Sequence, residues 1–249
     1  MSTTITPYYY DAQKYAWFTP VYVLANYDLL IRKYGANNLL KGDFKRAREM
    51  RAVAILLMGL YKEQGIIYYM QAFKESNSPD VVTVRLTERV DKPILGEFVE
   101  VEVVTFGQHS KEKDVVEFLK NSKLSPKKSY DALTVILCEI DKRARIDYKQ
   151  IHSDLAALNP KSHIYIMGRP ELNLPHVFQI FCAWPQLQSL NDIDVISLAK
   201  AYPKPHIFHL IMSSERKITF TKGNFKKPSL LEIFGLDENY INQKYPPLM

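Results

Sequence analysis

The feature that most constrains the fold is a switch of hydrophobic period at Gly65. Before it, residues 44–64 carry apolar side chains at the spacing of an amphipathic helix, with Asp43 as the expected N-cap and Gly65 as the stop. After it, three segments between residues 66 and 106 are β-branched and aromatic and are separated by turn residues. A helix followed by three short strands predicts an α/β domain whose sheet begins as a three-strand meander.

The rest of the chain continues to alternate between helical and extended patterns. An almost continuous apolar run at residues 132–138 predicts a strand that is covered on both faces. The expected helices cover residues 19–33, 44–64, 111–120, 148–158 and 195–201. The expected strands cover residues 66–73, 81–86, 98–106, 131–139, 162–167 and 177–183, with a hairpin at 206–212 and 217–221.

This order of elements predicts an α/β sandwich with a mixed central sheet. The chain has 249 residues, 47% of them hydrophobic, which suits one large domain with its own core. We expect an N-terminal helical extension at residues 1–40, a core at 41–170, and a C-terminal elaboration at 171–249 that packs on the same domain.

Composition narrows the class of protein further. The net charge of +6 modestly favours polyanionic partners. The two cysteines, Cys138 and Cys182, lie in apolar runs, so we expect them to be buried thiols and exclude a disulfide scaffold. No apolar stretch approaches the roughly 20 residues needed to cross a bilayer, and residues 1–10 lack the pattern of a signal peptide. We therefore expect a cytoplasmic protein without a membrane span.

Three carboxylates stand where two neighbouring strands of the meander could bring them together. Asp80 follows Pro79 at the start of the second strand, and alternation along the third strand puts Glu100 and Glu102 on one face. Burying such groups without a partner is costly, so a cation or water must satisfy them. Carboxylate oxygens suit a hard divalent cation such as Mg²⁺. Alternatively, Asp80 is only a turn residue and the two glutamates belong to a solvated or ion-paired face.

With this pattern, residues 44–167 resemble the PD-(D/E)XK nuclease superfamily, the restriction-endonuclease-like fold. The resemblance implies that Asp80 and Glu100 are metal-binding catalytic residues and that the Val101 carbonyl is a further ligand. It also implies an acidic residue on the preceding helix, for which Glu49 is the better candidate and Glu63 the second. The implied cofactor is Mg²⁺, with Mn²⁺ as a substitute. The implied function is hydrolysis of phosphodiester bonds in DNA, in a restriction, transposition or phage-defence setting.

The chain departs from the family pattern at Glu102, which stands where the family usually has Lys. Glu102 could act as a general base or as a ligand to a second metal ion. It could equally mark an inactive site, in which case the chain is a catalytically silent module that binds nucleic acid or a protein partner. A third alternative is an unrelated α/β binding domain whose carboxylates are structural.

Basic residues near these carboxylates are the candidates for binding DNA phosphates, with a solvated basic face as the alternative. Lys111 or Lys113 could also replace the missing Lys in space. Besides DNA, a second copy of the chain or accessory protein subunits are partners that such a function allows. The candidate phosphate-binding residues are Arg46, Arg48, Arg51, Arg85, Arg89, Lys111 and Lys113.

Overall fold

The computed structural model describes residues 16–72, 79–89, 92–125, 130, 133–142, 146–171, 173–203, 207–212, 218–221 and 227–248. Its helices are α1 (Pro20–Tyr34), α2 (Ala36–Leu39), η2 (Gly42–Phe44), α3 (Lys45–Gln64), α4 (Val115–Ser122), α5 (Tyr148–Leu158), α6 (Val195–Ala201), η3 (Glu232–Phe234) and α7 (Glu238–Lys244). Its strands are β1 (Trp17–Phe18), β2 (Tyr68–Ala72), β3 (Val81–Arg89), β4 (Lys92–Gly107), β5 (Thr134–Asp141), β6 (His163–Gly168), β7 (Val177–Trp184), β8 (Gln188–Asp194), β9 (Ile207–Met212) and β10 (Ile218–Thr221).

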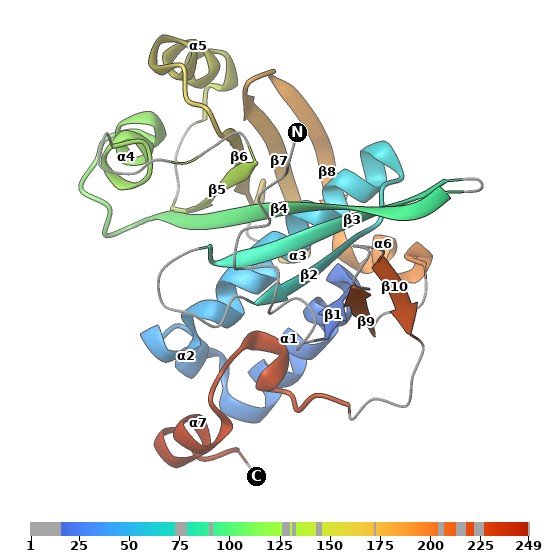
Figure 1. The fold of residues 1–249 in the computed structure, drawn as a ribbon. Coiled ribbons are helices and arrows are strands. Elements are labelled where there is room, and N and C mark those ends of the chain that lie inside the picture. The colour runs from blue at the N-terminus through green and yellow to red at the C-terminus, as the bar shows by residue number, and fades with distance from the viewer. Residues whose placement is uncertain are drawn as a thin grey trace.

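The strands form one mixed sheet in the order β10-β9-β1-β2-β3-β4-β5-β6-β7-β8 (Figure 1). Strands β2, β3 and β4 form the predicted antiparallel meander. Strands β4, β5 and β6 are parallel to one another, with α4 and α5 as the crossover helices. The predicted α/β class and the mixed sheet are confirmed, and so is the hairpin of β9 and β10. Strand β9 also pairs with β1, so segments near the two ends of the described chain lie side by side.

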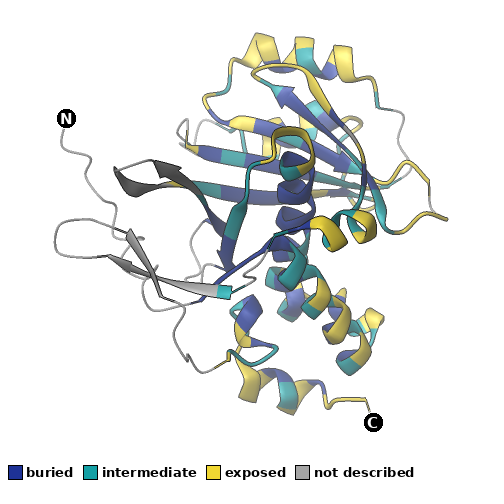
Figure 2. Ribbon diagram, turned by 90° about the vertical axis from the view of Figure 1, so that its right-hand side faces the viewer, coloured by how far each residue is buried: buried dark blue, intermediate teal, exposed yellow. Residues whose placement is uncertain are grey.

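Helices cover both faces of the sheet and create two cores. The larger core lies around α3, whose side chains are buried over much of its length (Figure 2). The smaller core lies on the other face, under α4 and α5. Gly59 lets α3 approach the sheet closely, because an added Cβ would lie 3.3 Å from the Cδ1 atoms of Ile180 and Leu190. Cys138 and Cys182 are buried free thiols, as predicted.

The helix α3 is confirmed to within one residue of its predicted bounds, but the predicted N-cap is wrong. Phe44 holds the N-cap position without a side-chain hydrogen bond, and Asp43 lies in η2 instead. The Asp43 carboxylate bonds to the C-terminal segment, where Tyr245 Oη donates to Oδ2 at 2.5 Å and Lys244 Nζ lies at 2.8 Å. Gly65 ends the helix in the left-handed conformation with φ of 67°. Among the described residues, no helix is long and apolar enough to cross a membrane.

Candidate functional site

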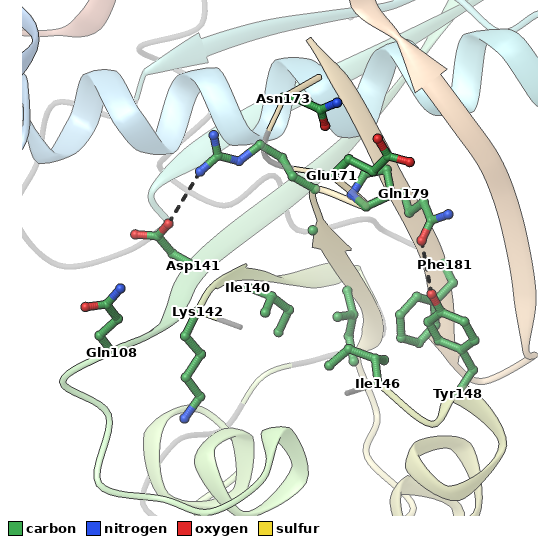
Figure 3. A pocket seen from close by; sticks show the side chains of 14 residues that line it. Gln108, Ile140, Asp141, Lys142, Ile146, Tyr148, Glu171, Asn173, Gln179 and Phe181 are labelled. Carbon is green, nitrogen blue, oxygen red and sulfur yellow. Dashed lines mark hydrogen bonds and ion pairs between the residues drawn. The ribbon is translucent and has the colours of Figure 1, made fainter. Parts of the chain in front are cut away.

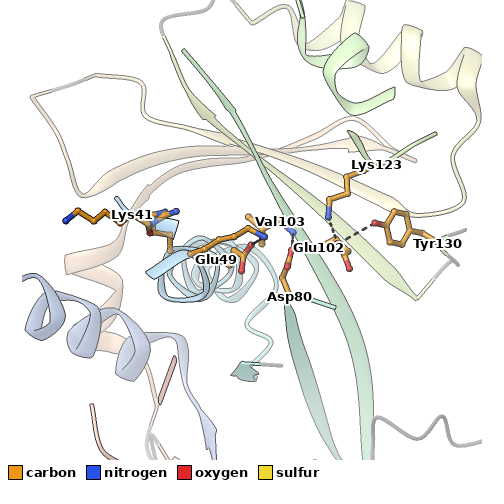
Figure 4. Close-up of polar contacts among 9 residues, drawn as sticks. Lys41, Glu49, Asp80, Glu102, Val103, Lys123 and Tyr130 are labelled. Carbon is orange, nitrogen blue, oxygen red and sulfur yellow. Dashed lines mark hydrogen bonds and ion pairs between the residues drawn. The ribbon is translucent and has the colours of Figure 1, made fainter. Parts of the chain in front are cut away.

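The candidate site lies at the fork where β3 separates from β4. The two strands pair as far as Val81 and Val101, and β4 then continues to Gly107 alongside β5. In the described part of the chain, no strand covers the other edge of β4 beyond this point. The Val103 N–H on that edge donates to Asp80 Oδ2 at 2.8 Å (Figure 4). The hydrogen bond replaces a strand partner and fixes the Asp80 carboxylate at the fork.

The register of the two strands sets Asp80 beside Glu102. Extending the pair of Val81 and Val101 by one residue places Asp80 opposite Glu102. Glu100 is instead opposite Val82, two residues further from the fork. Directly opposed side chains have Cβ atoms about 5 Å apart, whereas diagonal neighbours are about 7 Å apart. The fork therefore joins Asp80 most closely to Glu102 and more distantly to Glu100.

Glu102 is buried at this fork, with 3% of its surface exposed. Its Oε2 forms a close ion pair with Lys123 Nζ, which reaches it from the end of α4. The Tyr130 hydroxyl donates to the same oxygen at 3.4 Å. Burial raises the pKa of Tyr130, and the negative charge of Glu102 raises it further. A lysine and a tyrosine thus compensate the buried carboxylate.

Glu49 brings a third carboxylate to the fork from α3. It is 5% exposed, and Lys45 Nζ, one helical turn earlier, lies 2.8 Å from its Oε1. Burial raises the pKa of Glu49, and the nearby charge of Asp80 raises it as well. Figure 4 shows Glu49 and Glu102 reaching the fork from either side of Val103, with Asp80 beside them. Asp80 thus lies near Glu49 on one side of β4 and beside Glu102 on the other.

The donor chemistry of this group fits a hard divalent cation, which prefers carboxylate oxygens. In the present arrangement the lysines supply the compensating positive charge. Within the described ranges, no group of three or more His, Cys, Asp or Glu side chains is gathered as a metal site. Val101, predicted to offer its carbonyl, is paired on both sides within the sheet, and the backbone group at the fork belongs to Val103.

A cleft of about 690 Å³ runs from the fork along the open edge of β4. Residues 103–105 of β4 line it, together with residues of α3 and α4. Basic residues outnumber acidic ones among the described residues that line it. The basic residues are Lys45, Arg48, Arg51, Lys123 and Arg169, and the acidic ones are Glu49, Glu139 and Asp141.

Two of the predicted phosphate-binding residues line this cleft, and both also have structural partners. Arg48 donates to the backbone carbonyls of Leu39 and Lys41, the latter at 2.7 Å. Arg51 lies 3.6 Å from the Glu139 carboxylate and 5.3 Å from the centre of the Phe178 ring. Both guanidinium groups are therefore held in place at the wall of the cleft, where a phosphate could meet them without large rearrangement.

The other predicted phosphate-binding residues lie away from the cleft. Arg46 donates to the Gly235 carbonyl at 3.1 Å and so fastens the C-terminal segment. Arg85 pairs with Glu97 at 2.8 Å and lies five residues along β3 from Asp80, about 16 Å at the rise of a strand. Exposed Lys111 and Lys113 precede α4 and are not among the described lining residues. The side chain of Arg89 lies outside the described residues.

Three residues of the fork, Lys45, Lys123 and Tyr130, were not predicted as site residues from the sequence. Lys123 had a usable signal, because the helix of a parallel crossover returns the chain to the level at which the next strand begins. Thr134, the first residue of β5, is opposite Glu100, so the end of α4 must pass near Glu102. Tyr130 and Lys45 had no comparable signal.

No protein-family model matches the chain, and no curated protein matches it at a significant level. A function must therefore be inferred from the site, because folds host many activities.

Proposed function

We propose that the chain is a metal-dependent endonuclease of the PD-(D/E)XK kind, which hydrolyses phosphodiester bonds in DNA with Mg²⁺ or Mn²⁺. The observation that carries the proposal is the strand register that sets Asp80 opposite Glu102 at the open edge of β4, beside a basic cleft. A metal-assisted hydrolase needs carboxylates to hold the ion, and basic groups beside it to hold the phosphates.

The arrangement of elements supports the finer fold assignment within this proposal. Helix α3, the antiparallel strands β2, β3 and β4, helix α4 and the parallel strand β5 follow one another along the chain. This is the order that the resemblance to restriction-endonuclease-like proteins implies. Asp80 stands at the start of the second strand of this unit, and Glu102 stands within the third.

In the proposed site, Asp80 and Glu102 would hold the cation, and Glu49 would stand beside them. The cation would polarise the phosphate and lower the pKa of an attacking water. Lys123 would leave Glu102 and pair with the phosphate of the substrate. It would then take the role of the lysine that the family motif usually has. This assignment moves the acidic ligand from Glu100, as the resemblance alone implied, to Glu102.

A catalytically silent module is the second candidate, and one contact favours it. Lys123 already neutralises Glu102, so the buried carboxylate is stable without a metal ion. Such a module would bind nucleic acid or a protein through the basic cleft alone. Metal affinity separates the two candidates, because only the enzyme requires a cation at Asp80 and Glu102.

The test is cleavage of plasmid and single-stranded DNA in the presence of Mg²⁺, Mn²⁺ or EDTA. We expect metal-dependent cutting that falls at least about 100-fold in Asp80→Asn and in Glu102→Gln, because each removes a metal ligand worth several kcal/mol. Glu100→Gln is the matched control and should lose less than about tenfold, since Glu100 is a diagonal neighbour of Asp80. Circular dichroism establishes that each variant is folded.

Other outcomes would change the proposal in defined ways. No cutting with either metal, together with no rise in melting temperature on adding metal, would overturn it in favour of the silent module. Loss of cutting in Glu100→Gln, with Glu102→Gln active, would return the ligand role to Glu100. Unchanged cutting in all three variants would make the carboxylates structural.

A further inference from the structure

A second cavity, of about 1340 Å³, opens at the carboxyl ends of β4, β5 and β6, on the face covered by α5 (Figure 3). Gln108 follows β4 at its rim, and Tyr148, the first residue of α5, stands at the opposite side. The carboxyl edge of parallel strands is a common place for ligands in α/β proteins. The proposed phosphodiester hydrolysis uses neither Gln108 nor Tyr148.

The cavity and the basic cleft share a wall. Ile140, Asp141, Gly168 and Arg169 line both hollows. Arg169 and Asp141 form an ion pair at 3.8 Å, and both side chains are exposed. A strand that lies in the cleft can therefore pass this pair and place its next groups in the cavity.

Among the residues that the structure describes, the linings of the two hollows differ in charge. The described lining of the cavity has two basic residues, Lys142 and Arg169, against two acidic ones, Asp141 and Glu171. The cleft has five basic residues against three acidic ones. A balanced lining suits an uncharged group, whereas an excess of positive charge suits phosphates. One ligand that carries both kinds of group is a nucleic-acid strand.

The lining of the cavity has the chemistry that recognises a flat, hydrogen-bonding ring. Apolar side chains form part of the lining, and the rings of Tyr148 and Phe181 meet edge to face with their centres 4.2 Å apart. Gln179 is held by the Tyr148 hydroxyl at 3.3 Å and by Asp192 at 3.0 Å. Side-chain amides carry a donor and an acceptor, as base edges do, and aromatic rings stack on bases. The amides that line the cavity are Gln108, Asn173 and Gln179.

We propose that this cavity binds unpaired bases of the strand whose phosphates lie in the basic cleft. The preferred substrate class is then nucleic acid with a single-stranded segment next to the cut. The volume exceeds the roughly 300–1,000 Å³ of small-molecule pockets, which suits more than one nucleotide. The inference rests on the proposed function in one respect, namely that the strand in the cleft is nucleic acid.

The test measures binding in EDTA, where no cutting occurs, by fluorescence anisotropy of labelled oligonucleotides. We expect a short single strand to bind at least about tenfold more tightly than a blunt duplex of the same sequence. Tyr148→Ala should weaken single-strand binding about 5- to 100-fold, the effect of losing one stacked base. Gln108→Ala, at an exposed position where folding is not at risk, should weaken it less. Gln64→Ala, at the exposed end of α3, is the matched control and should change nothing.

Salt dependence gives a second readout. Base contacts release no counterions, so Tyr148→Ala should lower affinity without changing the slope of log affinity against log salt concentration. Equal binding of duplex and single strand, or full affinity in both cavity variants, would overturn the inference. Equally tight binding of a free mononucleotide would also overturn it, because the cavity would then be a nucleotide site. Binding as expected without any metal-dependent cutting would overturn the proposed function and leave this inference standing.

Discussion

The chain builds the same combination of a lysine, a carboxylate and tyrosine in two regions. At the C-terminal segment, Asp43 bonds to Lys244, Tyr240 and Tyr245. At the fork of β3 and β4, Glu102 bonds to Lys123 and Tyr130. The chemistry is alike, but the surroundings differ.

The Asp43 cluster lies at the surface and fastens one segment to another. The side chains of Lys244 and Asp43 are 47% and 23% exposed. Hydrogen bonds from Lys244 and Tyr245 lower the pKa of Asp43 to about 2. The same segment donates from Leu248 N to the Lys33 carbonyl at 2.8 Å, so the cluster is one of several contacts that hold it against the helices.

The Glu102 cluster is buried and sits beside other carboxylates. The side chains of Lys123 and Glu102 are 12% and 4% exposed, and Asp80 and Glu49 lie close by. Burying an ion pair gains little stability over apolar packing, and adding neighbouring carboxylates reduces the gain further. Holding the C-terminal segment in place explains the exposed cluster. The buried cluster stabilises the fold little, so we infer that its charges serve a function.

Replacing the lysine of each cluster gives the largest expected difference. Lys123→Met leaves Glu102 buried without its cation, so we expect the free energy of unfolding to fall by about 3 kcal/mol. Urea denaturation at pH 7 measures the change. Excess Mg²⁺ should restore part of the loss, because a cation that binds only the folded state stabilises it.

Lys244→Met is the matched control for that experiment. Its charge is solvated, so its loss should destabilise the protein much less, and Mg²⁺ should have no effect on it. The two clusters would be equivalent if both variants lost the same stability. The metal assignment would fail if Mg²⁺ stabilised neither Lys123→Met nor the wild-type protein.

The periodicity of the sequence was enough to predict most of the fold. The meander, the buried strand β5 and the helix α5 lie where apolar spacing placed them, because each buries its side chains in a regular pattern. The false N-cap at Asp43 shows where this reasoning stops. Its partners lie about 200 residues away in the chain, and a local pattern contains no information about them.

The candidate site was predicted less completely, because it depends on strand register. Alternation identified the acidic face of β4, yet it could not decide whether Asp80 meets Glu100 or Glu102. The pairing has an irregularity between Thr87 and Arg89, which shifts the register of the hairpin. Such a shift is set by the geometry near the turn, and so the partner of Asp80 is fixed far from the fork.

A pH series tests how the exposed Asp43 cluster stabilises the protein, and the expected change in unfolding free energy is smaller than for Lys123→Met. The pKa of Asp43 falls from 3.8 to about 2 on folding, so its contribution to stability is present above pH 4. The contribution is lost as the pH falls through the folded pKa of about 2, because the carboxylate is then protonated in the folded state as well as in the unfolded state. Wild type and Asp43→Asn should therefore differ in unfolding free energy at pH 7, and the difference should shrink toward pH 2 and vanish below it. A difference that persists unchanged at pH 2 would contradict this origin.

The smallest effect lies in the titration of the tyrosines, followed by NMR of ring-labelled protein. The hydrogen bond to Asp43 is the main cause that raises the pKa of Tyr245, whereas burial is the main cause for Tyr130. Asp43→Asn should therefore return most of the Tyr245 shift toward the ordinary value of 10. Glu102→Gln should lower the pKa of Tyr130 by only part of its shift, because the ring stays half-buried. Full return of Tyr130 to its ordinary value would show that the charge of Glu102, and not a low-dielectric environment, controls the fork. The carboxylate would then be the main cause of the raised tyrosine pKa in both the exposed and the buried cluster.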